Sequence, residues 1–155
     1  MATMVQSVQY GARETWWRFV WFLAVFGSLV AVLALPPASF WFDVERVHVH
    51  DAVEGSTPLM DVDRTIKRPF RGHWVATVMR KSGNGFYTFC TANGENDYSP
   101  EAQFPDIIDL NWWTWPTRCV LPVGTYQLRT LWTIEPAIFP TKELRITSNV
   151  FRITR

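Results

Sequence analysis

The stretch FVWFLAVFGSLVAVLAL, residues 19–35, contains no charged side chain. Counted from Trp16, the apolar segment has 20 residues. As a helix it would rise about 30 Å, the thickness of a bilayer's hydrocarbon core. Pro36 and Pro37 follow and end a helix, because proline lacks a backbone donor and disfavours helical geometry in the residue before it. The segment therefore predicts one N-terminal transmembrane helix, residues 16–36.

Aromatic residues stand at both ends of this segment. Trp16 and Trp17 lie at its start, and Phe40, Trp41 and Phe42 follow its end. Bulky or amphipathic rings favour the headgroup region of a bilayer. We therefore expect the lipid bilayer to be a partner of this chain, and we predict five membrane-anchoring residues: Trp16, Trp17, Phe19, Leu35 and Trp41.

Two other interpretations of the apolar segment stay open. In a cleaved signal peptide, Arg13 and Arg18 would form the basic region and Val32-Leu33-Ala34 the cleavage site. The apolar run exceeds the usual signal core of about 7–15 residues, which favours an uncleaved signal-anchor. The segment could also be the buried helix of a soluble domain, but no helical partner for it is evident downstream.

The charges around the segment suggest an orientation. Arg13 and Arg18 flank its start, whereas the first charges after it are Asp43, Glu45 and Arg46. Positive charge favours the cytoplasmic side. We expect residues 1–15 to form a short inner tail and residues 37–41 a linker. Residues 42–155 would then form one domain outside the cytoplasm, in a periplasm or on a virion membrane.

The overall charge selects no partner. Lys and Arg total 15, and Asp and Glu total 14. Without a basic excess, we expect no nucleic-acid binding.

Alternating and β-branched stretches separated by turn residues fill the chain after residue 41, a pattern typical of all-β domains. Ser82-Gly83-Asn84-Gly85 is expected to join two of them as a hairpin, because glycine and asparagine tolerate the positive φ of such turns. We predict about seven strands, at residues 42–50, 59–67, 72–81, 86–92, 107–115, 125–134 and 144–154.

The stretch LPVGTYQL, residues 121–128, places a tyrosine just after a tight turn, at the start of an alternating strand. It resembles the penultimate strand of immunoglobulin-like and related bacterial sandwiches, in which such a tyrosine bonds back to the corner backbone. Residues 148–153 would form the closing strand. The resemblance implies an antiparallel Ig-like β-sandwich. An anchor followed by one sandwich also looks like the small single-pass membrane-anchored proteins of bacteria and their phages.

Cys90 and Cys119 both fall in the predicted outer domain. Outside the cytoplasm two thiols oxidise if the fold brings them together, so we predict a disulfide. The alternative is two small buried residues that never meet. Two cysteines are too few for a structural zinc site.

Candidates for chemistry are sparse. His48 and His50 would share one face of a strand, with Asp43, Asp51 or His73 as a third metal ligand, but no known metal spacing is present. Asp61, Asp63 and the segment 93–97 offer oxygens to calcium without a calcium-loop pattern, and we expect solvated turns there. A nucleophile pair of Cys90 and His73 lacks an orienting third residue. We therefore expect no metal, no cofactor and no enzymatic activity.

Two groups of residues are candidates for an interaction surface. In an extended strand Trp113 and Trp115 face the side opposite Trp112, which suits a protein interface, a sugar ring or a membrane surface. An unusually aromatic core strand is the alternative. The second group is a short basic run that either is a solvated face or contacts anionic headgroups or an acidic protein, and it comprises Arg64, Lys67, Arg68 and Arg71.

These observations favour a non-catalytic structural or interaction protein, in which the helix holds a sandwich at a membrane for docking onto a larger assembly. Such an assembly would be a bacterial envelope complex or the virion of a membrane-containing phage, with a protein partner or oligomer of unknown identity. The alternative is a glycan- or peptide-binding module that uses Trp113 and Trp115. A hydrolase or metal-dependent activity using His48, His50 or the acidic loops is the third class.

Overall fold

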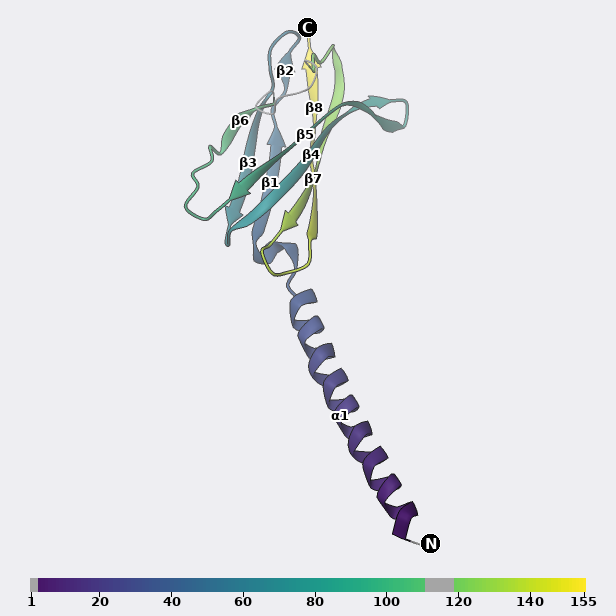
Figure 1. The fold of residues 1–155 in the computed structure, drawn as a ribbon. Coiled ribbons are helices and arrows are strands. Elements are labelled where there is room, and N and C mark those ends of the chain that lie inside the picture. The colour runs from purple at the N-terminus through teal and green to yellow at the C-terminus, as the bar shows by residue number, and fades with distance from the viewer. Residues whose placement is uncertain (1–2, 111–118) are drawn as a thin grey trace. The chain divides into compact units, whose positions relative to one another are not determined.

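A computed structural model of the chain describes residues 3–110 and 119–155, with side chains from Glu14 onward within these ranges. Contact clustering divides the chain into two compact units, Met1–Pro36 and Pro37–Arg155. The first unit is a helix and the second is a mostly β domain (Figure 1). Each unit is described separately below.

Helix α1, Thr3–Ala34, contains the predicted span. Its Glu14–Ala34 segment, 21 residues, is the one described helix long and apolar enough to cross a membrane, and none of it is buried. A helix in the core of a soluble protein would be mostly buried, whereas a signal sequence shares these properties. Because α1 begins at Thr3, the boundary predicted after residue 15 is a change of composition within one helix and is not the start of that helix.

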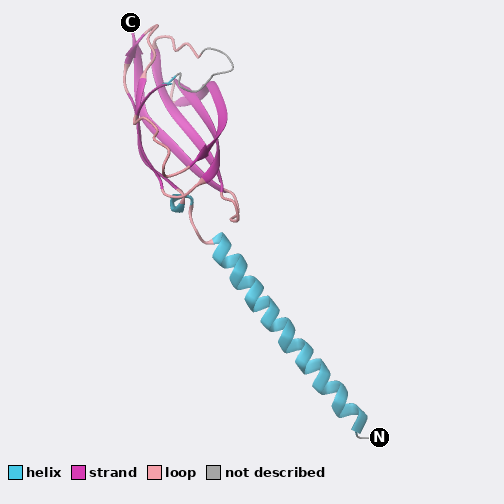
Figure 2. Ribbon diagram, turned by 60° about the vertical axis from the view of Figure 1, so that its left-hand side comes forward, coloured by secondary structure: helices cyan, strands magenta, loops and turns pink. Residues whose placement is uncertain are grey.

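The second unit contains a short 3-10 helix and eight described strands, which make up most of the domain (Figure 2). The strand boundaries agree with the predicted ones except in three places. Ala52–Val53 was not predicted, and Gly85–Tyr98 includes residues 93–97, where turns were expected. The described strand Ile107–Asp109 ends within the predicted 107–115, and residues 111–115 of that prediction lie outside the described residues. The elements are η1 Ala38–Phe40, β1 Phe42–Val49, β2 Ala52–Val53, β3 Leu59–Ile66, β4 Phe70–Ser82, β5 Gly85–Tyr98, β6 Ile107–Asp109, β7 Gly124–Glu135 and β8 Lys142–Thr154.

The strands form two sheets, one in the order β1-β3-β6 and one in the order β2-β8-β7-β4-β5. The five-stranded sheet curls into a half-barrel. All neighbours are antiparallel except the short β2, which is parallel to β8. The predicted β4–β5 hairpin is confirmed: Ser82 pairs with Gly85, and Gly83 supplies the positive φ of +55° that the turn requires.

The sheets enclose two apolar clusters. The first is aromatic and contains Trp41, Phe42, Phe70, Tyr98, Trp132 and Ile134. The second is built mainly from aliphatic residues around Tyr126 and Phe151. Strand β7 contributes to both because its inward positions alternate with outward ones, as a period of two requires.

Trp41 is not the membrane anchor that the sequence predicts. Its side chain is 3% exposed, and its ring packs edge-on against Phe139 at 5.1 Å. Its backbone oxygen accepts hydrogen bonds from the N–H groups of Lys67 and Arg68. A ring enclosed in this way has no surface to offer to headgroups, so the correct role of Trp41 is in the core.

Several bonds close the domain. The Tyr126 hydroxyl donates to the Pro122 oxygen at 2.7 Å, so the bond predicted from the turn before β7 is confirmed. Cys90 and Cys119 lie at disulfide distance, with Cα atoms 6.2 Å apart, and the structure pairs them as predicted. Asn149 on β8 links the two sheets: its side chain accepts from the Val49 N–H at 2.8 Å and donates to the Val49 oxygen at 2.9 Å.

Candidate functional site

Two members of the predicted basic run lie where the chain enters the domain. Lys67 pairs with Asp43 at 2.9 Å, and the Arg68 guanidinium lies 3.9 Å from the centre of the Phe40 ring. Both belong to the turn between β3 and β4, whose backbone is bonded to Trp41. The turn is therefore fixed against the first residues of the domain.

The loop between β7 and β8 reaches the same end. Phe139 packs on Trp41, and the neighbouring Ile138 is 75% exposed. We call the region where the chain enters the domain the proximal end, and define it by residues 37–40, 67–68 and 138–139. It combines two cations with an exposed apolar side chain.

The other two members of the run lie elsewhere. Arg71 points to the outer face of the five-stranded sheet and pairs with Glu95 at 2.7 Å. Glu95 also lies 3.3 Å from His73. Arg64 lines a cavity between the sheets. The four cations of the run therefore do not form one surface.

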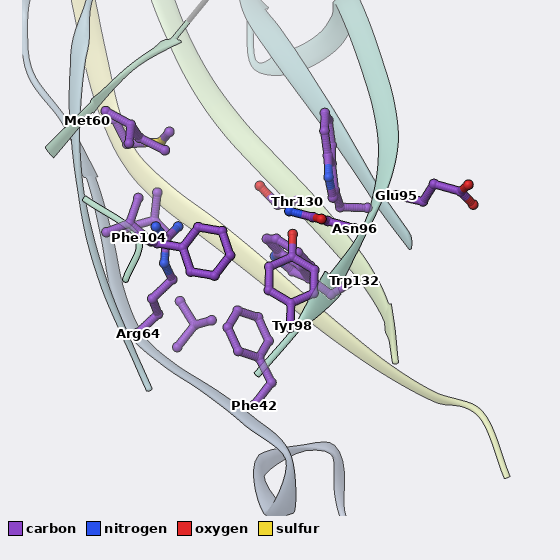
Figure 3. Close-up of a pocket in the computed structure, with 14 residues that line it drawn as sticks. Phe42, Met60, Arg64, Glu95, Asn96, Tyr98, Phe104, Thr130 and Trp132 are labelled. Atoms are coloured by element: carbon purple, nitrogen blue, oxygen red, sulfur yellow. The ribbon is translucent and has the colours of Figure 1, made fainter. Parts of the chain in front are cut away.

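The cavity measures about 210 Å³ and lies between the two apolar clusters. Figure 3 shows Phe42, Tyr98 and Trp132 of the aromatic cluster on one side and Met60 of the other cluster opposite. Strands of both sheets supply the walls. The remaining lining residues are Val44, Val47, Val62, Arg64, Trp74, Glu95, Asn96, Phe104, Ile108 and Thr130.

Two hydroxyl groups in this cavity have no hydrogen-bond partner among the described residues. They belong to Tyr98 and Thr130, which are 7% and 5% exposed. No side-chain nitrogen or oxygen in the described part is both cut off from solvent and unpartnered, so these hydroxyls border open space. In Figure 3 the Tyr98 hydroxyl points towards Thr130 and Asn96, whereas the Glu95 carboxylate points away.

Arg64 is a partly buried cation at the cavity. One Nη donates to the Pro105 oxygen at 3.1 Å, and the guanidinium lies 5.1 Å from the centre of the Phe104 ring. Burial lowers the pKa of Arg64, against the attraction of nearby Tyr98 and Asp106. Among the described residues no carboxylate forms an ion pair with it.

The same cavity acts on Tyr98. Burial raises its pKa to about 12, although the positive charge of Arg64 favours the ionised phenolate and opposes the shift. The phenol therefore stays protonated at neutral pH and is able to donate a hydrogen bond. Arg64 and Tyr98 together present donors to the cavity.

The histidines form no metal site in the described part of the chain. The rings of His48 and His50 contact each other at 5.1 Å, and His50 bonds to Asp61 at 2.9 Å. No group of three or more metal-ligating side chains is found among residues 14–110 and 119–155. The Cys90–His73 nucleophile pair, which the sequence already disfavoured, is not available, because Cys90 is held in the disulfide and pairs across the strands with Val78.

Trp112, Trp113 and Trp115 lie outside the described residues, so their predicted roles in an interface or in glycan binding stay predictions. Sequence reasoning missed most of the cavity. One signal was present: Thr130 is a polar residue at an inward position between Leu128 and Trp132. A hydroxyl in an otherwise apolar alternation indicates either a buried bond or a polar space.

Comparison with known proteins finds no matching family model, no matching curated protein and no matching solved structure.

Proposed function

We propose that this chain is a non-catalytic, membrane-anchored interaction protein that holds its β domain at a bilayer surface and presents it to a larger assembly. One observation carries the proposal: the apolar segment Glu14–Ala34 is followed after only three residues by η1, the first element of the domain. Such an assembly would be a bacterial envelope complex or the virion of a membrane-containing phage.

The short connection limits where the domain sits if the helix spans a membrane. Four residue steps separate Ala34 from Ala38, so at most about 14 Å of extended chain lies between them. Because the residues of the proximal end contact Phe40 and Trp41, we infer that this end would then lie close to the headgroups. Lys67 and Arg68 would each gain about 1 kcal/mol near anionic lipid, and the exposed Ile138 suits the boundary between headgroups and acyl chains.

We also propose that the domain is an Ig-like sandwich. In the nomenclature of that fold, β1, β3 and β6 correspond to strands A, B and E, and β8, β7, β4 and β5 correspond to G, F, C and C′. The bond from Tyr126 to the Pro122 backbone supports this assignment. The disulfide departs from the family pattern, because Cys90 lies on β5 rather than on β3.

The proposed topology places the N-terminus inside and the domain outside the cytoplasm. The Cys90–Cys119 pairing supports it, because disulfides persist in oxidising compartments and are rare in the cytosol. The positive charges of Arg13 and Arg18 around the start of the span agree with this orientation.

Fractionation tests the anchor. The full chain is expected to stay with membranes through washes with high salt and with alkaline carbonate, and to need detergent for release. An N-terminal peptide is expected in the mature protein by mass spectrometry. Release by salt alone, or a mature chain beginning after Ala34, would refute the anchor.

A photo-crosslinking residue at position 138 tests the placement of the domain. It is expected to capture lipid in intact membranes, because Ile138 is exposed at the proximal end. Position 87 is the matched control: Tyr87 is 46% exposed and lies beside the β4–β5 hairpin, at the other end of β5 from Tyr98. Equal lipid capture from both positions would contradict the proposal.

The same two probes test the partner. Position 87, away from the proximal end, is expected to capture a protein of the assembly. If probes at exposed positions of β4, β5 and β7 capture no protein in intact membranes or particles, the interaction role fails while the anchor stands.

A further inference from the structure

The cavity between the sheets has features that the proposed anchoring role does not use. An anchored domain needs only a filled core, yet here the two apolar clusters are separated by about 210 Å³ of space. For comparison, an engineered apolar cavity of about 150 Å³ stays dry and binds benzene. The question is what this cavity holds.

The walls of the cavity are apolar and favour binding of an apolar group. Phe42, Val62 and Trp132 are all less than 8% exposed and line it with carbon. Trp74 and Phe104 add aromatic surface. A polar molecule such as a sugar would lose its hydrogen bonds to water against these walls without replacement. By comparison with the benzene-sized cavity, the apolar body would contain roughly six to eight carbon atoms.

The polar groups that line the cavity include hydrogen-bond donors, which favour a ligand whose polar end accepts hydrogen bonds. Tyr98 and Thr130 are residues with more than nine-tenths of their surface buried. Their hydroxyls border the cavity and have no partner among the described residues. Arg64 adds a guanidinium whose described partners are a backbone oxygen and a phenyl ring. A partly buried cation without an ion-paired carboxylate carries some desolvation cost, which an incoming anion would offset.

Other charges near the cavity do not replace that anion. The carboxylate of Glu95 is bonded to Arg71 and lies beside His73 on the outer face. Asp106 attracts Arg64 through space but forms no ion pair with it among the described residues. The guanidinium therefore keeps donors for a bidentate acceptor, a geometry that carboxylates match well.

We propose that the inter-sheet cavity is a binding site for a small amphipathic carboxylic acid. Its carboxylate accepts hydrogen bonds from Arg64, Tyr98 and Thr130, and its apolar body lies against Trp132, Phe42 and Val62. The proposal is independent of the anchoring role: the acid would occupy the domain whether or not the helix spans a membrane.

The test uses the full chain in nanodiscs of phosphatidylcholine, which lack anionic lipid. The probe is 3-(4-fluorophenyl)propionate, followed by fluorine NMR, and its uncharged amide is the matched ligand control. We expect saturable binding of the acid and binding of the amide that is weaker by about tenfold or more, as for the loss of a charge-assisted hydrogen bond.

Variants locate the site. Arg64→Met and Tyr98→Phe are each expected to weaken binding about tenfold, because each removes a donor to the carboxylate while keeping most of the side-chain volume. Thr133→Val is the control: it removes a hydroxyl from the other face of the same strand as Thr130. Val44→Phe is expected to abolish binding by filling the cavity.

Each variant is compared with the parent chain by circular dichroism and urea unfolding, so that loss of binding is separated from loss of the fold. Absence of saturable acid binding to the folded parent chain would overturn the proposal. Equal binding of acid and amide would overturn it as well. Unchanged binding in both folded Arg64→Met and Tyr98→Phe would show that the acid only partitions into lipid, which is the third contrary result.

Discussion

At the scale of single residues, the indole of Trp74 leaves no space for a side chain at Gly94 on the neighbouring strand. A Cβ atom added at Gly94 would lie 2.5 Å from Cζ2 of Trp74 and 2.9 Å from Cε2. Trp74 on β4 therefore lies across the backbone of β5, and only glycine permits this. The same indole packs against both apolar clusters and forms part of the cavity wall.

Gly94→Ala should consequently destabilise the domain by about 1–3 kcal/mol, the usual cost of overpacking. The control is Gly85→Ala on the same strand, because an added Cβ there meets nothing within 4 Å. Urea unfolding of the detergent-solubilised chain, followed by tryptophan fluorescence, measures both. Equal stability of the two variants would contradict the tight packing.

Tyr98 predicts a pH dependence of stability. Its pKa is about 12 in the folded chain, whereas an exposed tyrosine ionises near pH 10. Below about pH 10 both states are protonated and the contribution of Tyr98 is complete. Between about pH 10 and 12 the unfolded phenol loses its proton first, so the free energy of unfolding should fall by about 1.4 kcal/mol per pH unit.

The measurement compares the parent chain with Tyr98→Phe between pH 9 and 11. Other groups titrate in both chains, so the difference between the two curves isolates Tyr98. The variant should lose less stability across this range, by about 1 kcal/mol at pH 11. Parallel curves would show that the phenol is solvated in the folded chain.

At the scale of elements, alternation of apolar and polar residues predicted the strands well because each sheet has an inner face to fill. It failed at residues 93–97. Asn-Gly-Glu-Asn-Asp has the composition of a turn, yet it is strand, because the ladder with β4 continues to Phe70 and Gly94 accommodates Trp74. A contact between strands overrode the local preference, and no single stretch of sequence contains that information.

The contact between the two sheets includes the side chain of Asn149. Its two bonds to the Val49 backbone tie β8 of one sheet to β1 of the other. Asn149→Ala should lower the free energy of unfolding by about 2 kcal/mol, because two backbone groups lose partners. Amide exchange at Val49 should accelerate as well.

The control for Asn149 is Asn93→Ala on β5, where the side chain is exposed. Its effect should stay within about 0.5 kcal/mol, as is usual for surface substitutions. Slow exchange at Val49 in Asn149→Ala would show that the strand pairing with β3 protects this amide without the side chain.

At the scale of the whole molecule, the sequence predicted the helix followed by one β domain more readily than it predicted the cavity between the sheets. Charge-free composition and prolines define the helix locally, and the cysteines are easily counted. The sequence could not predict that Arg64 points towards the cavity, because its side chain bonds to Pro105, 41 positions away. Trp41 was misassigned for a similar reason: its partner Phe139 lies on a distant loop.

The disulfide gives a prediction for the whole domain. Cys90 and Cys119 are separated by 29 positions, and in the chain-entropy view closing such a loop contributes about 3–4 kcal/mol. Replacing both with alanine should lower the free energy of unfolding by that amount. A thiol-reactive label should modify the native chain only after reduction; labelling of two thiols before reduction would contradict the pairing.

The short joint between helix and domain has a mechanical consequence. Tension applied through α1 would reach the domain at η1 and Trp41, directly before β1, since only Leu35, Pro36 and Pro37 precede η1. When the far end of the domain is gripped, that pull runs along β1, which holds β3 through seven paired positions. Strands pulled lengthwise must break these pairs together, whereas strands peeled from one end release them singly. If the helix anchors the chain as proposed, a pull between the anchor and the far end would load the β1–β3 pairs lengthwise.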